Sequence, residues 1–196
     1  MGLFKKFSAP KAKIELKLNE VAYNYTDKLT GRIAGRIVLD AQEDISVDEF
    51  RIEFGGNKKI KWKKGFSSYS SSSSLASTKI PVGGPVNLRK GQHYEQPFQI
   101  DIPQYSKPDP FTELEIKVKG VAAVKGRPDL THEVRPAINF PYVIECLREY
   151  GGCGFITQPM PNPVKACPRC GNNLEEVWNR KYRDESREAS HGTRRF

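Results

Sequence analysis

The sequence predicts an all-β fold, an antiparallel β-sandwich, and three observations lead to this prediction. Apolar and polar residues alternate over most of residues 12–144, which is typical of strands with one buried face. Prolines interrupt this region too often for long helices. No helical periodicity begins before residue 174. Eight or so short strands at this spacing indicate two packed antiparallel sheets.

The strands are predicted in chain order from this alternation. The first begins where Ile14, Leu16 and Leu18 alternate with charged residues. The next three are predicted in "TGRIAGRIVLDA", "ISVDEFRIEFGG" and "KKIKWKK". In the last of these, Ile60 and Trp62 face inward and the lysines face outward. Further strands are predicted in "STKIPV", "HYEQPFQIDIP", "TELEIKVKGVAAV" and "THEVRPAINFPYVIE".

Two polar segments are expected to lie outside the core. Seven of the eight residues 67–74 are serine, so almost nothing there can drive burial, and a mobile loop is predicted. The last eighteen residues are mostly polar and predict a disordered or partly helical tail. The predicted organisation is therefore a flexible basic N-terminus at 1–11, a sandwich at 12–144 with a mobile Ser-rich loop at 67–78, a four-cysteine segment at 145–178, and a polar tail at 179–196.

Several strands resemble the N-terminal domain of arrestins. "KIELKLNEVAYNYTDKLTGRIAGRIVL" is similar to the opening of that domain, with a glycine-containing second strand from Gly31 to Val38. "FTELEIKVKGVAAVKG" resembles a later strand of the family. "LRKGQHYEQPFQIDIP" resembles an element in which a glycine precedes an alternating strand that closes on proline, here Gly91, Phe98, Ile100, Ile102 and Pro103.

The resemblance covers roughly residues 12–144, and it implies adaptor or scaffold work without chemistry. Closer analogues than the eukaryotic arrestins are small prokaryotic arrestin-like proteins, including the sporulation-control group, and the arrestin-like subunit of retromer. Eukaryotic arrestins have two sandwiches, whereas this chain has room for one. Their buried charged cluster, which responds to phosphorylated receptors, has no visible counterpart, so phosphoreceptor sensing is not implied.

Four cysteines follow the predicted sandwich and predict a structural Zn²⁺ site. They are Cys146, Cys153, Cys167 and Cys170. Four thiolates suit Zn²⁺, and a site filled by four protein ligands leaves no position for a reactive water. "CPRCG" resembles the second knuckle of zinc ribbons, in which the glycine permits the positive φ that the turn requires. Two disulfides, redox-active thiols and another metal such as iron are the alternatives.

The fourth ligand is the open question of this site. A tight first knuckle would have a cysteine at the position of Tyr150, and Cys146 lies four residues earlier. Cys146 is expected to come from the end of the last sandwich strand. If it were an ordinary buried strand residue, a histidine would have to replace it, and the candidates are His93, His132 and His191.

Localised positive charge indicates an anionic partner. The net charge is +9, and it equals the number of lysines in the first thirteen residues and in the stretch 58–64. Nucleic-acid binding by a zinc-ribbon protein is therefore the alternative function, and a solvated sheet face is the simpler interpretation. The candidate binding residues are Lys58, Lys59, Lys61, Trp62, Lys63 and Lys64.

The remaining expectations concern location and chemistry. Residues 1–7 combine apolar and basic side chains, which would allow peripheral membrane contact. No apolar run reaches the ~18–20 residues of a transmembrane helix, and no secretory signal is visible, so a cytoplasmic location is expected. No catalytic or phosphate-binding motif appears. A non-enzymatic adaptor or scaffold that recognises proteins or peptides is the predicted function.

Overall fold

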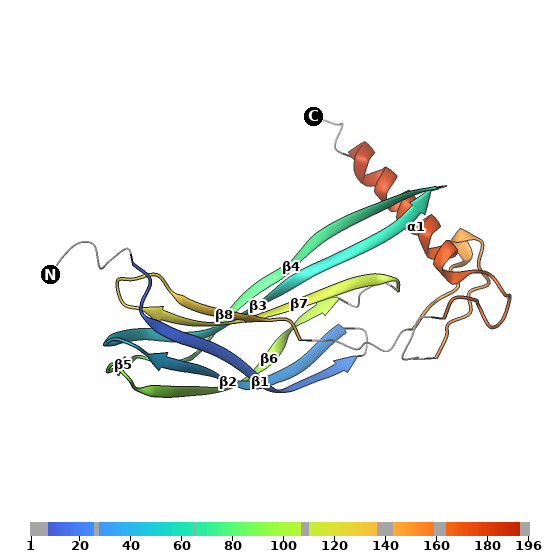
Figure 1. Cartoon of the computed structure of the whole chain (residues 1–196). Coiled ribbons are helices and arrows are strands. Elements are labelled where there is room, and N and C mark those ends of the chain that lie inside the picture. Colours follow the sequence, from blue (N-terminus) through green and yellow to red (C-terminus); the bar gives the residue numbers. More distant parts are fainter. Residues whose placement is uncertain are drawn as a thin grey trace. The chain divides into compact units, whose positions relative to one another are not determined.

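The computed structural model describes residues 8–25, 28–64, 66–106, 110–136, 143–158 and 164–192. Figure 1 shows the elements of these residues, which are mostly strands, with one α-helix near the C-terminal end. The strands are β1 (Ala12–Tyr25), β2 (Lys28–Ala41), β3 (Ile45–Lys64), β4 (Ser67–Gly83), β5 (Val86–Leu88), β6 (His93–Ser106), β7 (Thr112–Val124) and β8 (Leu130–Val134), and the helix is α1 (Leu174–Gly192).

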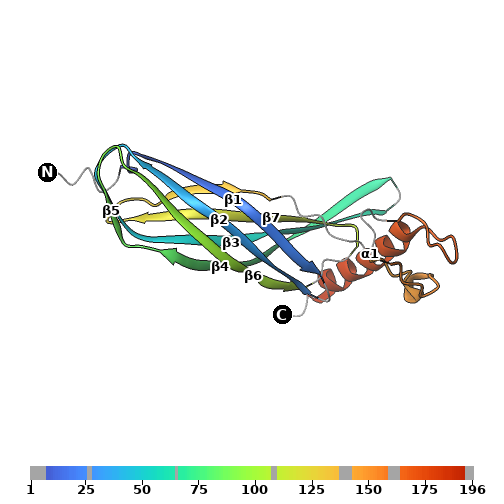
Figure 2. The ribbon, with the colours of Figure 1, turned by 90° about the horizontal axis from the view of Figure 1, so that it is seen from below.

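The strands form two sheets. One has the order β1-β2-β6, and the other has the order β4-β3-β7-β8 with β5 paired to β3. The pairings β1–β2, β2–β6, β3–β5 and β7–β8 are antiparallel. Figure 1 shows the sheets as two layers, and Figure 2 looks onto the layer that contains β1, β2 and β6. The prediction of an all-β antiparallel fold is confirmed, although several strands are longer than expected.

The chain divides into two compact units that are discontinuous in sequence. Unit 1 comprises residues 1–56, 75–107 and 115–137, and unit 2 comprises 57–74, 108–114 and 138–196. Strands β3, β4 and β7 therefore contribute to both units. The domain boundaries that the sequence suggests stay a prediction.

Unit 1 contains the sandwich core. Its alternating apolar residues are buried between the sheets, as the period of two predicts. Gly120 of β7 lies against Leu16 and Ile37 of the other sheet, where an added Cβ would be 3.3 Å from either side chain. The largest fully buried side chains of unit 1 are Ile33, Ile37, Leu39, Val47, Phe50, Ile52, Phe54, Ile116 and Val118.

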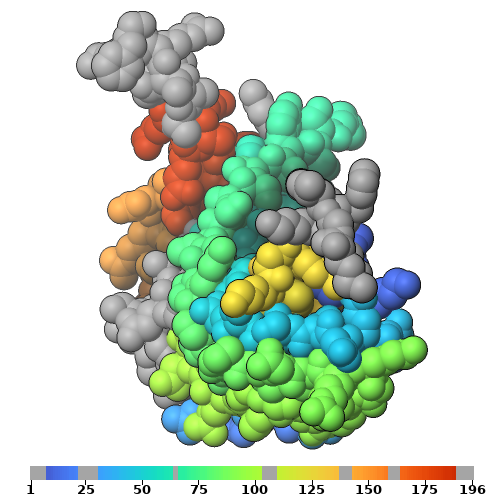
Figure 3. Space-filling view, turned by 90° about the vertical axis from the view of Figure 1, so that its left-hand side faces the viewer, coloured from blue at the N-terminus to red at the C-terminus, as the bar shows by residue number. Residues whose placement is uncertain are grey.

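The turns at one end of the sandwich are joined by backbone hydrogen bonds. Lys125 N, after β7, donates to Ser46 O of β3 at 2.9 Å, and Gly91 N, before β6, donates to Ala41 O of β2 at 2.7 Å. Figure 3 looks onto this end, where the β7–β8 turn (yellow) lies beside the β2–β3 connection (light blue). Arg127 and Glu43 also form an ion pair between these turns.

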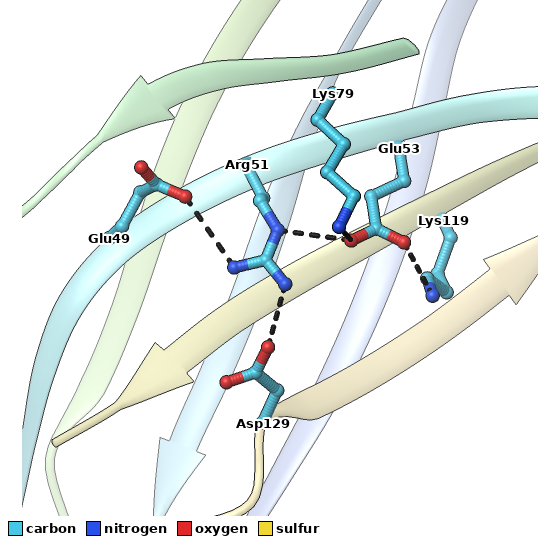
Figure 4. A network of polar contacts seen from close by, with 6 residues as sticks. All are labelled: Glu49, Arg51, Glu53, Lys79, Lys119 and Asp129. Atoms are coloured by element: carbon cyan, nitrogen blue, oxygen red, sulfur yellow. Dashed lines mark hydrogen bonds and ion pairs between the residues drawn. The ribbon is translucent and has the colours of Figure 1, made fainter. Parts of the chain in front are cut away.

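A charged network covers the outer face of β3 in unit 1. Arg51 and Glu53 alternate with the buried Phe50, Ile52 and Phe54, so they project from the opposite face of the sheet. Figure 4 shows their contacts with residues of other strands and turns. The N–O distances are 3.0 Å for Arg51–Glu53, 3.5 Å for Arg51–Glu49, 2.6 Å for Arg51–Asp129, 2.5 Å for Lys119–Glu53 and 3.7 Å for Lys79–Glu53.

The serine run forms a strand, and the prediction of a loop at 67–78 is wrong. Residues 67–74 begin β4, which pairs with β3, and all eight side chains are exposed. A strand is stabilised by backbone hydrogen bonds to its neighbour, which serine provides as well as any other residue. The absence of apolar side chains therefore did not exclude a strand at this position.

The predicted polar tail is helical over residues 179–192. Helix α1 begins at Leu174 and continues to Gly192. Two ion pairs at i,i+4 spacing, Glu176–Arg180 and Lys181–Glu185, support the helix. Among the described residues before 174 there is no α-helix, in agreement with the prediction for that region. No helix of the described residues is long and apolar enough to cross a membrane.

Candidate metal centre

The four cysteine sulfurs of unit 2 meet at one point. All four Sγ atoms lie within 4.8 Å of one another. The Cys146–Cys170 sulfurs are 3.7 Å apart, and the Cys153–Cys167 sulfurs are 3.6 Å apart. Four thiolates about 2.3 Å from a tetrahedral ion would be about 3.8 Å apart, so the donor set fits a metal ion.

The same distances exclude the disulfide alternative in this structure. A disulfide places its sulfurs about 2.05 Å apart, and all four cysteines are free. Cys146 and Cys167 are buried, Cys153 is half-buried and Cys170 is exposed. The cluster therefore has one side open to solvent, through which an ion can enter.

These sulfurs lie on two knuckles of the chain, and the two knuckles have equivalent backbone hydrogen bonds. In the first knuckle, Gly154 N donates to Cys146 O at 2.7 Å, and Cys146 N donates to Phe155 O at 2.8 Å. In the second, Gly171 N donates to Cys167 O at 2.9 Å, and Cys167 N donates to Asn172 O at 2.8 Å. Each donor and acceptor has the same place relative to its cysteine pair.

The equivalence continues beyond the cysteines. The residue before the first cysteine of each knuckle forms a β-bridge with the residue three after the second cysteine. One step further out, Thr157 N donates to Ile144 O at 3.0 Å, and Leu174 N donates to Lys165 O at 2.8 Å. Cys146 therefore occupies the position in its knuckle that Cys167 occupies in the "CPRCG" knuckle.

A short turn accommodates the longer spacing between the two cysteines of the first knuckle. Arg148–Tyr150 form a 3-10 helix between the two cysteines. Gly152 N donates to Leu147 O at 2.8 Å, which closes this turn. Tyr150, which stands where a tight knuckle would have a cysteine, belongs to the inserted turn. Cys146 precedes the turn and lies beyond β8, which ends at Val134, so it does not come from the last sandwich strand.

A glycine follows the second cysteine of each knuckle for a conformational reason. Gly154 has a φ of 77° and Gly171 has a φ of 75°, in the left-handed region where a side chain is strained. This backbone turns the amide of each glycine back toward the carbonyl of the first cysteine. The predicted role of Gly171 is observed, and Gly154 has the same role.

Backbone amides point at the sulfurs and shift their ionisation. Cys153 N donates to the Cys146 sulfur at 3.4 Å. Burial nevertheless raises the pKa of the Cys146 thiol to about 12. Burial also acts to raise the pKa of Cys167, but hydrogen bonds from the Cys170 and Arg169 amides and thiol contacts lower it to about 7. Contacts within the cluster also raise the pKa of Cys170, so Cys167 alone of these three thiols ionises more readily than usual.

Helix α1 covers the cluster with an apolar stripe. Leu174, Trp178 and Tyr182 are buried at helical spacing and pack with Ile144, Cys146 and Cys167. Asn173 caps the helix, because its Oδ1 accepts a hydrogen bond from Glu176 N at 3.1 Å. The partly buried residues packed against this core are Ile60, Trp62, Phe111, Leu147, Cys153, Phe155 and Val164.

Two side chains of α1 also fix the helix by hydrogen bonds. Trp178 Nε1 donates to Glu145 O at 2.9 Å, next to the first ligand position. The buried Tyr182 hydroxyl donates to Pro110 O. The segment before Cys146, the helix and residue 110 are thus joined within unit 2.

The candidate basic strand lies in the same unit. Trp62 packs against the cysteine core, whereas Lys59, Lys61 and Lys63 are exposed, so the predicted inward and outward faces are confirmed. Lys61 forms an ion pair with Glu113. Lys58 is half-buried, and the side chain of Lys64 is not among those described.

The histidines do not join the cluster in the described residues. His93 contacts Asp40 at 2.6 Å, and His132 Nδ1 accepts a hydrogen bond from Leu16 N at 3.1 Å, both within unit 1. The side chain of His191 lies outside the described residues, as do residues 1–7, for which membrane contact is predicted.

A pocket of about 320 Å³ borders the basic strand and includes residues that the sequence does not single out. Tyr69 of β4 stacks on Trp62 with ring centroids 6.1 Å apart and an interplanar angle of 15°. Glu175 and Asn179 of α1 also line the pocket. One signal for Tyr69 was available, since it is the only aromatic residue within the serine run.

Comparisons with known proteins give structural similarity only. No family model matches the chain, and no curated protein matches it. The chain is similar to the sporulation control protein Spo0M from Bacillus subtilis, with 15% identity and a TM-score of 0.43, over 63% of this chain. It is also similar to beta-glucuronidase 2 from Bacteroides uniformis, with 14% identity and a TM-score of 0.31, over 78% of this chain. These matches span 47% and 15% of the two proteins' own chains.

Proposed function

We propose that the protein is a non-enzymatic adaptor or scaffold whose unit 2 is held in its fold by one structural Zn²⁺. The observation that carries this proposal is the convergence of four sulfurs on two equivalent knuckles. The ligands would be Cys146, Cys153, Cys167 and Cys170. When bound, the ion would supply folding free energy and no reactive water, because the protein fills all four positions.

The small core of unit 2 supports a structural role for the ion. Six buried residues form its centre, and two of them are cysteines. A core of this size contributes little, whereas zinc binding supplies roughly 10 kcal/mol or more in small zinc peptides. The amide hydrogen bonds to sulfur and the apolar cover of α1 are features that would stabilise bound thiolates.

The edge strands of the two sheets support an adaptor role. Strands β1 and β6 are at the ends of one sheet order, and β4 and β8 are at the ends of the other. An edge strand offers unpaired backbone groups, to which an extended peptide of a partner protein can add as a further strand. Four cysteines without a disulfide suit a reducing compartment, so we place the adaptor in the cytoplasm.

Elemental analysis of the full chain, purified without chelator or affinity metal, tests the metal assignment. We expect about one zinc per chain and a strong loss of zinc in Cys146→Ser. His93→Ala is the matched control and retains the zinc, because His93 is exposed and contacts Asp40. Stoichiometric iron, or full zinc retention by Cys146→Ser, would contradict the proposal.

Affinity purification from the native host tests the adaptor role separately. We expect specific protein partners that remain bound at moderate salt, because strand addition relies on backbone hydrogen bonds. A protein that captures no partner, or one that shows turnover of a substrate, would contradict it.

A further inference from the structure

The hairpin that joins β3 to β4 has a composition that the adaptor role does not explain. Residues 57–74 contain five lysines, three aromatic residues and no acidic residue. Phe66, at the turn, is fully exposed. This segment belongs to unit 2, together with α1.

The aromatic pair of this hairpin presents a flat apolar surface. Trp62 packs against the cysteine core and also stacks on Tyr69. The Tyr69 side remains accessible, because this residue is 46% exposed. A nearly parallel pair of rings anchored in a core is a rigid platform on which a planar group can stack.

The pocket beside the pair offers hydrogen-bonding groups suited to the edge of a planar base. Asn179 can donate and accept, and Ser68 and Ser70 add hydroxyls. Glu175 can accept a hydrogen bond from an exocyclic amine, and its charge disfavours a phosphate inside the pocket. The 320 Å³ volume is compatible with a single nucleobase.

Exposed lysines of β3 lie along the same pocket. Lys59, Lys61 and Lys63 line it, and Lys61 pairs with Glu113. Within the described part of the chain, no ion pair involves Lys59 or Lys63. Two ammonium groups are therefore available to an anionic backbone adjacent to the aromatic surface.

We propose that this pocket binds single-stranded nucleic acid, with one base on the Trp62–Tyr69 pair and flanking phosphates near Lys59 and Lys63. An acidic peptide could use the lysines, but it has no planar base for the aromatic platform or the Asn179 amide. The site goes beyond the adaptor role and does not require the metal to be zinc.

Binding of a fluorescein-labelled single-stranded DNA 12-mer, and of its RNA equivalent, to the full chain tests this site. We expect saturable binding whose affinity falls steeply with salt. Tyr69→Ser should weaken it about tenfold, whereas Tyr69→Phe, which keeps the ring, should bind like wild type. Lys59→Gln with Lys63→Gln should flatten the slope of log affinity against log salt by about 1.4.

Matched controls separate a specific site from general charge attraction. Lys90→Gln with Lys125→Gln removes the same charge from turns of unit 1 and should leave the slope nearly unchanged. Circular dichroism establishes that each variant is folded. Equal binding of polyglutamate, unchanged affinity in Tyr69→Ser, or no saturable binding at low salt would each overturn the proposal. Zinc content is measured in parallel, so a failure here is distinct from a failure of the metal assignment.

Discussion

The two units of this protein reach a stable core by different means. Unit 1 buries alternating apolar side chains of two sheets, including Phe50, Ile52 and Phe54, which are at most 1% exposed. Unit 2 has a small core in which Cys146 and Cys167 are as buried as its apolar residues. We therefore expect apolar burial to suffice for the sandwich, and the knuckles to need the proposed Zn²⁺ for their stability.

The largest expected effect comes from removing the proposed Zn²⁺. Chelation, or Cys167→Ser, should unfold the knuckles and α1 while the sheets of unit 1 remain. Both tryptophans, Trp62 and Trp178, lie in unit 2, so their fluorescence should move toward that of exposed indole. The β-sheet signal in circular dichroism should persist.

The control for this prediction is re-addition of the metal. Added Zn²⁺ should restore the fluorescence of wild type but not of Cys167→Ser. Loss of both signals in one transition would show that the units are not independent in the way the comparison suggests.

A cavity in the sandwich should produce the opposite pattern. Phe50 is fully buried and stacks on Tyr94 with ring centroids 5.3 Å apart. Phe50→Ala should therefore destabilise unit 1 by about 3–5 kcal/mol, measured by denaturant unfolding followed by circular dichroism. The zinc content and tryptophan fluorescence of the native variant should match wild type. Phe66→Ala is the control, because Phe66 is fully exposed and its loss should cost little.

The smallest expected effect is a pH dependence of unit 1. Burial acts to raise the pKa of Glu53, but Lys119 and Arg51 outweigh it and hold the pKa below its usual value. A carboxylate with a lowered folded pKa stabilises the fold above its unfolded pKa, and this contribution is lost as pH falls through the folded pKa.

Thermal unfolding of wild type and Glu53→Gln between pH 7 and pH 3 measures the contribution of the Glu53 carboxylate to stability. The stability difference between the two should be about 1 kcal/mol at neutral pH and should shrink on acidification. Glu113→Gln, in unit 2, should not change the acid dependence of the β-sheet transition. A difference that grows on acidification would reverse the sign and contradict the assignment.

Local patterns were sufficient for the strands with alternating apolar residues and for one knuckle. Alternation predicts which residues of β1 to β3 face the core, because side chains of a strand point to opposite faces in turn. "CPRCG" predicts the second knuckle because its two cysteines and its glycine lie within a few residues of one another. The charged network around Arg51 was not predictable, since Asp129 is 78 residues away in the chain.

The sequence by itself determined the all-β class, the inward side of the basic strand and four cysteines suited to one ion. Only the tertiary structure decided that Cys146 is equivalent to Cys167, because a 3-10 turn absorbs the extra residues between Cys146 and Cys153. It also decided that the serine run is a strand, because that depends on a backbone partner and not on the run's own side chains. The local conformational preference of a segment depends on neighbouring residues, whereas its hydrogen-bond partners across the fold depend on how distant segments pack.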